Sequence, residues 1–143
     1  EGFEIPRLSS YCGRNIKHGG WWPDYVLRLF KRESGTFSSD LVHERVIVNG
    51  RIAQLKHSLL HEAFINSDEV LAKVNNYSTL GAKKLHDLGE ASSLKKAILK
   101  GSWMFFRTYI LKLGFLDGKQ GLMLAISSAE VTYYKYVKLM QLQ

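Results

Sequence analysis

Hydrophobic and polar positions follow different patterns in the two halves of this chain. Before about residue 65, apolar residues come in short runs broken by turn residues, as in FEIPRL and YVLRLFKR, which is typical of β-strands. Later they recur at helical spacing, as at Leu122, Ile126, Ala129, Tyr133, Val137 and Met140. The pattern predicts an α+β fold, with short strands and a hairpin over residues 1–65 and three helices over residues 66–143.

Three stretches of the first half carry specific strand signals. Pro6 places the first strand at a sheet edge or at a strand end, because proline cannot donate a ladder hydrogen bond. Residues 25–32 carry apolar side chains on both faces, which predicts a mostly buried strand. Asn49 and Gly50 stand between two apolar runs, and this pair predicts a hairpin with a type I′ turn.

Helix signals divide the second half into three segments. Ser67 is the predicted N-cap of the first helix, with acidic residues in its first turn, and the helix is expected to run to residue 88. The second is predicted to start at Ser92 or Ser93 and to end at Gly114. The loop GFLDGKQG then leads into a last helix that ends near the C-terminus.

The net charge of +7 and a pI near 9.5 indicate an anionic partner, which the charge alone leaves open among nucleic acid, a phosphorylated substrate and a membrane surface. The single cysteine, Cys12, cannot form an intrachain disulfide and suits a reducing cytoplasm. No apolar run reaches the roughly 18 residues that a membrane-spanning helix requires.

The second predicted helix is basic and aromatic. Residues 92–116 hold five basic residues and no acidic ones, and Lys96, Lys100 and Arg107 share one helix face while Trp103 lies among the aromatic residues. Such a helix fits the surface of an anionic membrane. It equally fits a buried helix with one solvated basic ridge. A nucleic-acid groove uses the same residue types, but no recognised nucleic-acid-binding motif is present.

His43 and Glu44 precede the apolar run at residues 46–48. A carboxylate at the end of a buried strand can remove a proton from an attacking hydroxyl, and partial burial would raise its pKa toward the working range. The alternative is a surface glutamate paired with Arg45 or Arg51.

The segment GGWWPD combines flat apolar surfaces with a carboxylate. Trp21 and Trp22 can stack on sugar rings while Asp24 binds hydroxyl groups; alternatively, both tryptophans pack in the core. Arg28 falls within an apolar strand, where an unpaired charge is costly, so it needs a carboxylate or a ligand phosphate as its partner.

His57 and His61 are four residues apart, a spacing that on a helix would permit metal binding. The order is not H-E-x-x-H and no third ligand is evident nearby, so ordinary structural histidines and no metal site are expected.

Three segments of the chain resemble a known family, and they follow one another in the same order as in that family. FEIPRLSSYCGRNIKHGGWWPDYVLRLFKR, LVHERVIVNG and FFRTYILKLGFLDGKQGLMLAISSAEVTYYKYVKL look like the C-terminal part of bacterial lipopolysaccharide core glycosyltransferases. These are family 2, inverting enzymes of the GT-A type, and the β-1,4-glucosyltransferases that add glucose to an inner-core heptose are the most similar.

The resemblance implies a role for each candidate residue. Residues 1–65 would form the acceptor-side portion of a GT-A type domain, with Glu44 as the catalytic base and Arg28 near the diphosphate or supporting the base. The acceptor site would be lined by Trp21, Trp22, Asp24 and His43. Residues 66–143 would form a C-terminal helical region that contacts the membrane through Lys96, Lys100, Trp103 and Arg107.

Family members also have an N-terminal half in which an Asp-x-Asp motif binds a divalent metal, Mg or Mn, and the donor phosphates. This chain has no D-x-D. The resemblance therefore implies a fragment that holds no metal, is inactive alone, and has strand edges able to pair with another copy.

The implied partners are a nucleotide sugar, expected to be UDP-glucose, the heptose acceptor of the lipopolysaccharide inner core, and the inner-membrane surface, with no nucleic acid. The implied location is cytoplasmic and peripheral to the inner membrane. The alternative is a basic nucleic-acid-binding or membrane-surface interaction domain without catalysis.

Overall fold

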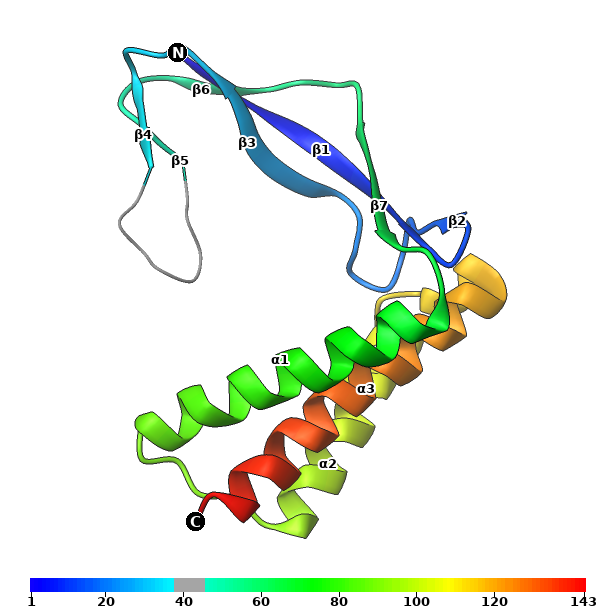
Figure 1. The fold of residues 1–143 in the computed structure, drawn as a ribbon. Coiled ribbons are helices and arrows are strands. Elements are labelled where there is room, and N and C mark those ends of the chain that lie inside the picture. The colour runs from blue at the N-terminus through cyan, green and yellow to red at the C-terminus, as the bar shows by residue number, and fades with distance from the viewer. Residues whose placement is uncertain (38–45) are drawn as a thin grey trace.

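The computed structural model describes residues 1–37 and 46–143, and there a strand region precedes three long helices (Figure 1). The predicted α+β class is confirmed. The strands are β1 (Gly2–Tyr11), β2 (Arg14–Asn15), β3 (Asp24–Phe30), β4 (Gly35–Phe37), β5 (Val46–Val48), β6 (Ile52–Gln54) and β7 (Leu59–Phe64). The long helices are α1 (Ser67–Asp87), α2 (Leu94–Phe106) and α3 (Gly118–Gln141), with a π-helical turn, η1 (Arg107–Leu111), and a 3-10 turn, η2 (Gly114–Asp117), between α2 and α3.

Strand β1 is the centre of the main sheet. It pairs antiparallel with β3, and on other stretches it pairs parallel with β6 at residues 2–4 and with β7 at residues 7–11. Pro6 lies between the stretches that pair with β6 and β7. The prediction that Pro6 marks an edge or a strand end is therefore wrong: it lies inside the best-connected strand, at the point where one parallel neighbour gives way to the next.

Two further strand predictions are also wrong. Among the described residues β3 pairs only with β1, so Tyr25 and Leu29 are 41% and 52% exposed rather than buried. The hairpin at Asn49 and Gly50 does not form, because β5 pairs antiparallel with β4 whereas β6 pairs with β1. A type I′ turn needs positive φ at both central residues, and of these two only Gly50 has it. Pairing of the β3 edge with a second copy stays a prediction.

The helix ends were predicted more closely than the strands. Ser93, one of the two residues at which the second helix was predicted to start, caps α2: its hydroxyl oxygen accepts a hydrogen bond of 3.2 Å from the Lys96 N–H. The cap of α1 is Asn66, one residue before the predicted Ser67; its side-chain oxygen accepts a hydrogen bond of 3.0 Å from the Glu69 N–H. Helix α3 begins at Gly118, inside the segment expected to be a loop.

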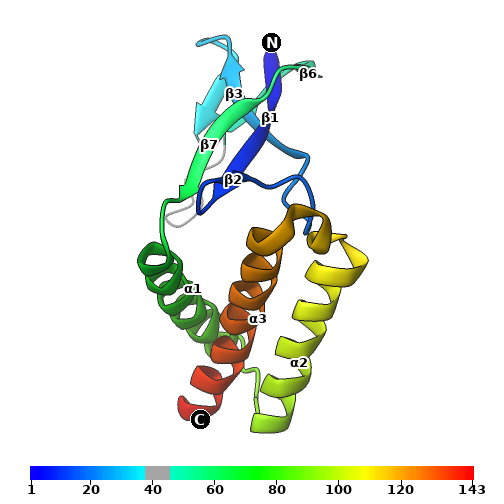
Figure 2. The same cartoon turned by 90° about the vertical axis from the view of Figure 1, so that its right-hand side faces the viewer.

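Helix α3 lies between α1 and α2 and packs against both (Figure 2). Its buried positions are Gly121, Leu124, Ala125, Ser127, Thr132 and Leu139. Leu122 and Ile126 of the predicted packing stripe are instead 38% and 45% exposed. Because two helices cover α3, its buried surface is wider than one stripe and is made in part by small residues.

The contact between α1 and α3 includes a polar group. The Lys138 ammonium on α3 donates hydrogen bonds of 2.8 Å to the Asn75 side-chain oxygen and to the hydroxyls of Ser78 and Thr79 on α1. Ser78 is fully buried, so this ammonium satisfies a hydroxyl oxygen that water does not reach. Helices α1 and α3 are therefore held in one register by directional bonds as well as by packing.

The turn that joins η2 to α3 requires glycine. A Cβ added to Gly121 would lie 1.9 Å from the backbone oxygen of Gly114, and one added to Gly114 would lie 2.7 Å from the backbone oxygen of Thr108. Both contacts involve backbone, which cannot move aside as a flexible side chain does. Two pairs of backbone segments therefore approach each other here too closely to admit a side chain.

We expect Gly121→Ala to lower the free energy of unfolding by about 3 kcal/mol, because the new methyl group overlaps the Gly114 carbonyl. Urea denaturation of both proteins measures this difference. Lys119→Ala, at an exposed position in the same turn, is the matched control and should change stability by less than about 0.5 kcal/mol. Equal unfolding midpoints for Gly121→Ala and the parent would contradict this account of the turn.

Candidate functional site

Three aromatic side chains meet where the sheet reaches the helices. The ring of Trp21 stacks on Phe64 at a centroid distance of 5.9 Å, and Tyr11 lies 5.3 Å from Phe64 and 5.9 Å from Trp21. Tyr11 is buried, while Trp21 and Phe64 are half-buried against the core. The cluster thus joins β1, β7 and the segment before β3 into one surface.

Tyr11 fastens this aromatic cluster to α3. Its hydroxyl lies 3.0 Å from the Ser127 hydroxyl, which itself donates to the Leu124 carbonyl. Burial raises the pKa of Tyr11 above its usual value, the largest cause being desolvation of the phenolate. The phenol therefore keeps its proton and donates a hydrogen bond to the Ser127 hydroxyl oxygen.

A buried carboxylate fixes the segment that leads to Trp21. Asp117, at the end of η2, is only 3% exposed. It accepts hydrogen bonds from the backbone N–H groups of Lys17 and His18, the latter at 2.7 Å, and lies 3.2 Å from the His18 Nδ1. The next residue, Gly19, donates its N–H to the Lys112 carbonyl at 2.8 Å. These bonds bring the GGWWPD segment to the end of the helices.

A cavity of about 400 Å³ opens beside Trp21. Aromatic rings and charged groups share its walls, which include Trp21, Phe64, Tyr77, Arg7, Asp24, His61 and Lys73. Strands β1, β3 and β7, the segment before β3, and helix α1 all contribute. The cavity is thus built where the sheet, the aromatic cluster and the first helix meet.

The charged groups of the cavity are partly paired. Arg7 donates from Nε to Asp24 Oδ2 at 2.8 Å, and its Nη2 donates to the same oxygen. Among the described residues, nothing bonds the other oxygen of Asp24. Lys73 lies 4.4 Å from the centre of the Phe64 ring and donates to the Ala63 carbonyl at 3.0 Å. The cavity therefore offers an aromatic wall, one free carboxylate oxygen and two cations, which suits a hydroxyl-rich or anionic ligand.

The structure brings together some of the predicted site residues. Trp21 and Asp24 line the same cavity, whereas Trp22 is half-buried but is not among its lining residues. Arg28 is exposed on β3, so the expectation that its charge is buried within an apolar strand is wrong, while its role beside a phosphate or the base stays a prediction. His43 and Glu44 lie outside the described residues.

Sequence reasoning missed Arg7, Phe64 and Lys73. Each comes from a different element, and none is close in sequence to Trp21 or Asp24. The one local signal was weak: Arg7 is a charged residue inside the first apolar run. The three meet only through the parallel pairing of β1 with β7 and the packing of α1 below it.

The four residues predicted to form a membrane-contacting face on α2 differ in their surroundings. Lys96 folds back along its own helix end, donating to the Ala91 carbonyl at 2.7 Å and lying 3.4 Å from the Glu90 carboxylate. Lys100, Trp103 and Arg107 are exposed. Lys96 is therefore engaged within the protein, while the other three are open to solvent.

His57 and His61 do not share a helix face, because His61 lies on β7 and His57 on the bend before it. In residues 1–37 and 46–143, no group of three or more His, Cys, Asp or Glu side chains is arranged to hold a metal ion. In the same ranges, no helix is both long and apolar enough to cross a membrane.

The sequence is similar to two bacterial glycosyltransferases. The lipopolysaccharide core biosynthesis glycosyltransferase LpsC of Rhizobium meliloti is 30% identical over 131 residues, which cover 82% of this chain and 48% of LpsC. The chain is thus similar in sequence to a glycosyltransferase named for lipopolysaccharide core biosynthesis. An uncharacterized glycosyltransferase of Rickettsia conorii is 25% identical over 121 residues, 78% of this chain and 43% of the relative.

The chain spans less than half the length of these glycosyltransferases. No protein-family model and no solved structure matches it. The similarity therefore rests on sequence alone.

We expect Asp117→Ala to lower the free energy of unfolding by about 3 kcal/mol, because it leaves the Lys17 and His18 N–H groups without their acceptor. Denaturant unfolding measures the change. Asp87→Ala is the matched control: that side chain is 81% exposed at the end of α1, and its loss should be nearly neutral. Similar costs for the two variants would show that Asp117 does not hold the segment.

Proposed function

We propose that this chain is the acceptor-side part of an inverting GT-A type glycosyltransferase that transfers glucose from UDP-glucose to the inner core of lipopolysaccharide. The similarity to LpsC supports the reaction class. The observation that carries the assignment of the site is the cavity beside Trp21, where a stacked aromatic pair adjoins the Asp24 carboxylate, of which one oxygen accepts no hydrogen bond from the described residues.

Each wall of the cavity has a part in holding the acceptor. The exposed portion of Trp21 packs against the apolar face of a sugar ring, while the free oxygen of Asp24 accepts a hydrogen bond from a ring hydroxyl. Arg7 keeps the Asp24 carboxylate oriented through its other oxygen. Lys73 attracts anionic groups of the acceptor. Trp22 and His43 are proposed as further contacts with the acceptor.

The proposed chemistry is a single displacement. Glu44 removes the proton from the acceptor hydroxyl, whose oxygen attacks C1 of the donor sugar. The bond from C1 to the nucleoside diphosphate breaks, the diphosphate leaves with the bonding electron pair, and the configuration at C1 inverts. Arg28, exposed on β3, is proposed to lie near the diphosphate or to support Glu44.

The proposed reaction uses a divalent metal, Mg or Mn. The described residues contain no group of three or more His, Cys, Asp or Glu side chains that could bind it, and the chain has no D-x-D motif. The metal and the donor phosphates are therefore assigned to a part of the enzyme that carries an Asp-x-Asp motif. We place the enzyme in the cytoplasm, at the inner membrane that holds its acceptor. No observation favours the alternative of nucleic-acid binding.

Glu44→Gln in the intact enzyme should reduce acceptor-dependent release of UDP from UDP-glucose by about 10²- to 10⁴-fold, because glutamine cannot take up the proton. Binding of the donor should persist. Glu90→Gln, at an exposed site before α2, is the control and should keep full activity. If Glu44→Gln retains most of the activity, the base is another residue.

Asp24→Asn should raise the KM for the lipopolysaccharide acceptor about tenfold, through loss of a charged hydrogen bond, and should leave UDP-glucose affinity unchanged. Initial rates at varied acceptor concentration measure this, with Asp87→Asn as the exposed control. An unchanged acceptor KM in a folded Asp24→Asn enzyme would remove the cavity from the acceptor site.

A further inference from the structure

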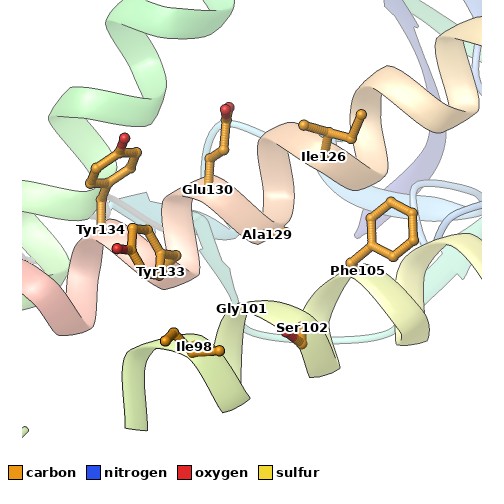
Figure 3. A pocket seen from close by; sticks show the side chains of 9 residues that line it. All are labelled: Ile98, Gly101, Ser102, Phe105, Ile126, Ala129, Glu130, Tyr133 and Tyr134. Carbon is orange, nitrogen blue, oxygen red and sulfur yellow. The ribbon is translucent and has the colours of Figure 1, made fainter. Parts of the chain in front are cut away.

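A groove of about 510 Å³ runs between helices α2 and α3 (Figure 3). Small residues form its floor: a Cβ added to Gly101 would lie 3.1 Å from the Tyr133 Cβ and 3.4 Å from the Ala129 carbonyl oxygen, so the two helices approach closely there. Larger side chains stand along both sides of this contact: Ile98, Ser102 and Phe105 from α2, and Ile126, Glu130, Tyr133 and Tyr134 from α3. None of these residues lines the cavity beside Trp21.

The walls of the groove are mostly apolar and are open to solvent. Ile98 on α2 is 50% exposed, and Ile126 and Tyr134 on α3 are each 45% exposed. Sites for small molecules enclose most of the ligand's surface. Walls that are half-exposed cover a small molecule on one side only, whereas a polypeptide segment can lie along the whole groove.

Glu130 is the charged residue of the groove. Among the nine lining residues, all of which the structure describes, no other side chain carries a charge at neutral pH. The positions three and four residues away on α3 are occupied by Ile126, Ser127, Tyr133 and Tyr134, so no cation of the same helix face pairs with it. In the described residues its carboxylate makes no hydrogen bond or ion pair. Glu130 is therefore available to an occupant of the groove.

Aromatic rings lie close to this carboxylate. Figure 3 shows Glu130 between Ile126 and Tyr134 along α3, with Tyr133 and Phe105 on the side toward α2. The ring centroids of Tyr133 and Tyr134 are 5.1 Å apart, in an edge-to-face arrangement. Faces of aromatic rings attract cations, and the planar guanidinium group of arginine also stacks on them. A carboxylate beside such rings fits an arginine side chain.

The charge of the groove is opposite to that of the protein as a whole. The net charge is +7, so general electrostatics favours acidic ligands. A preference of the groove for a basic ligand can arise only from the local carboxylate and rings. The two effects therefore predict opposite selectivity, which an experiment can distinguish.

We propose that the groove between α2 and α3 binds a polypeptide segment of a partner protein that presents an arginine between apolar side chains. The apolar side chains pack against Ile98, Phe105 and Ile126, as in other complexes where an amphipathic segment lies in a groove. The arginine donates hydrogen bonds to Glu130 and stacks on Tyr134. The proposal does not depend on the glycosyltransferase reaction.

Two synthetic peptides test the proposal with the intact protein. Both are alanine-based helices with leucines at positions i, i+3 and i+7; one carries arginine and the other glutamate at position i+4. Fluorescence anisotropy of the labelled peptides should show the arginine peptide bound at least about fivefold more tightly. General electrostatics of a protein with charge +7 predicts the reverse order. No binding, equal binding or a preference for the glutamate peptide overturns the proposal.

Variants locate the contact. Glu130→Gln keeps the size of the side chain and should bind the two peptides equally, whereas Glu130→Lys should bind the glutamate peptide at least about fivefold more tightly. Asp87→Lys is the matched control: it makes the same change of charge at a side chain that is 81% exposed at the end of α1, and it should keep the preference for arginine. A preference for arginine that persists in Glu130→Lys, or that Asp87→Lys also reverses, overturns the proposal. Thermal unfolding of each variant verifies that the bundle is intact.

A second copy of the chain and a small organic cation are the competing occupants. Sedimentation velocity without peptide distinguishes the first: a stable dimer that Glu130→Lys dissociates would assign the groove to a second copy and overturn the proposal. Displacement of the labelled arginine peptide distinguishes the second: free argininamide that displaces it as well as the unlabelled peptide does would indicate a site for small cations and also overturn the proposal. A monomer from which argininamide displaces the peptide only at much higher concentration supports it.

Discussion

A buried carboxylate, Asp117, ties the segment after β2 to the turn before α3. Asp117 is held by N–H groups of Lys17 and His18, which precede it by about a hundred positions in the chain. A carboxylate is costly to bury unless such donors meet it, so the segment after β2 and the turn before α3 fix each other's positions. That segment continues into Trp21, and the cavity therefore has its shape only when this contact is made.

The cavity is built from groups that also hold the fold together. Trp21 packs on Phe64, Lys73 lies over the same ring, and Arg7 is bonded to Asp24. Side chains that are already ordered lose little conformational freedom when a ligand arrives. The sequence left open whether Trp21 packs in the core or binds a ligand. In the structure the same side chain packs against the core and lines the cavity, so the two roles are compatible.

Local signals in the sequence predicted the features that depend on interactions between residues close in the chain. Ser93 caps its helix because the bond it makes is to a residue three positions on, and the division into strands and helices follows from periodicity. The strand partners and the lining of the cavity depend on contacts between residues far apart in the chain. Asn49 and Gly50 favour a hairpin, but β6 finds its partner in β1, which the turn sequence cannot reveal. Arg7 and Lys73 reach the cavity through contacts between distant elements, and no spacing in the sequence marks them.

The position of α3 between the other two helices has a consequence for how the protein is made. Helices α1 and α2 both leave the ribosome before α3 does, and each has its main packing partner in α3. Until residues 118–141 emerge, Val70, Val74 and Ala97 lack the part of their packing surface that α3 supplies. Short isolated helices are marginally stable in water. The bundle is thus expected to form in one late, cooperative step rather than helix by helix, and nascent chains at that stage present the apolar surfaces that chaperones bind.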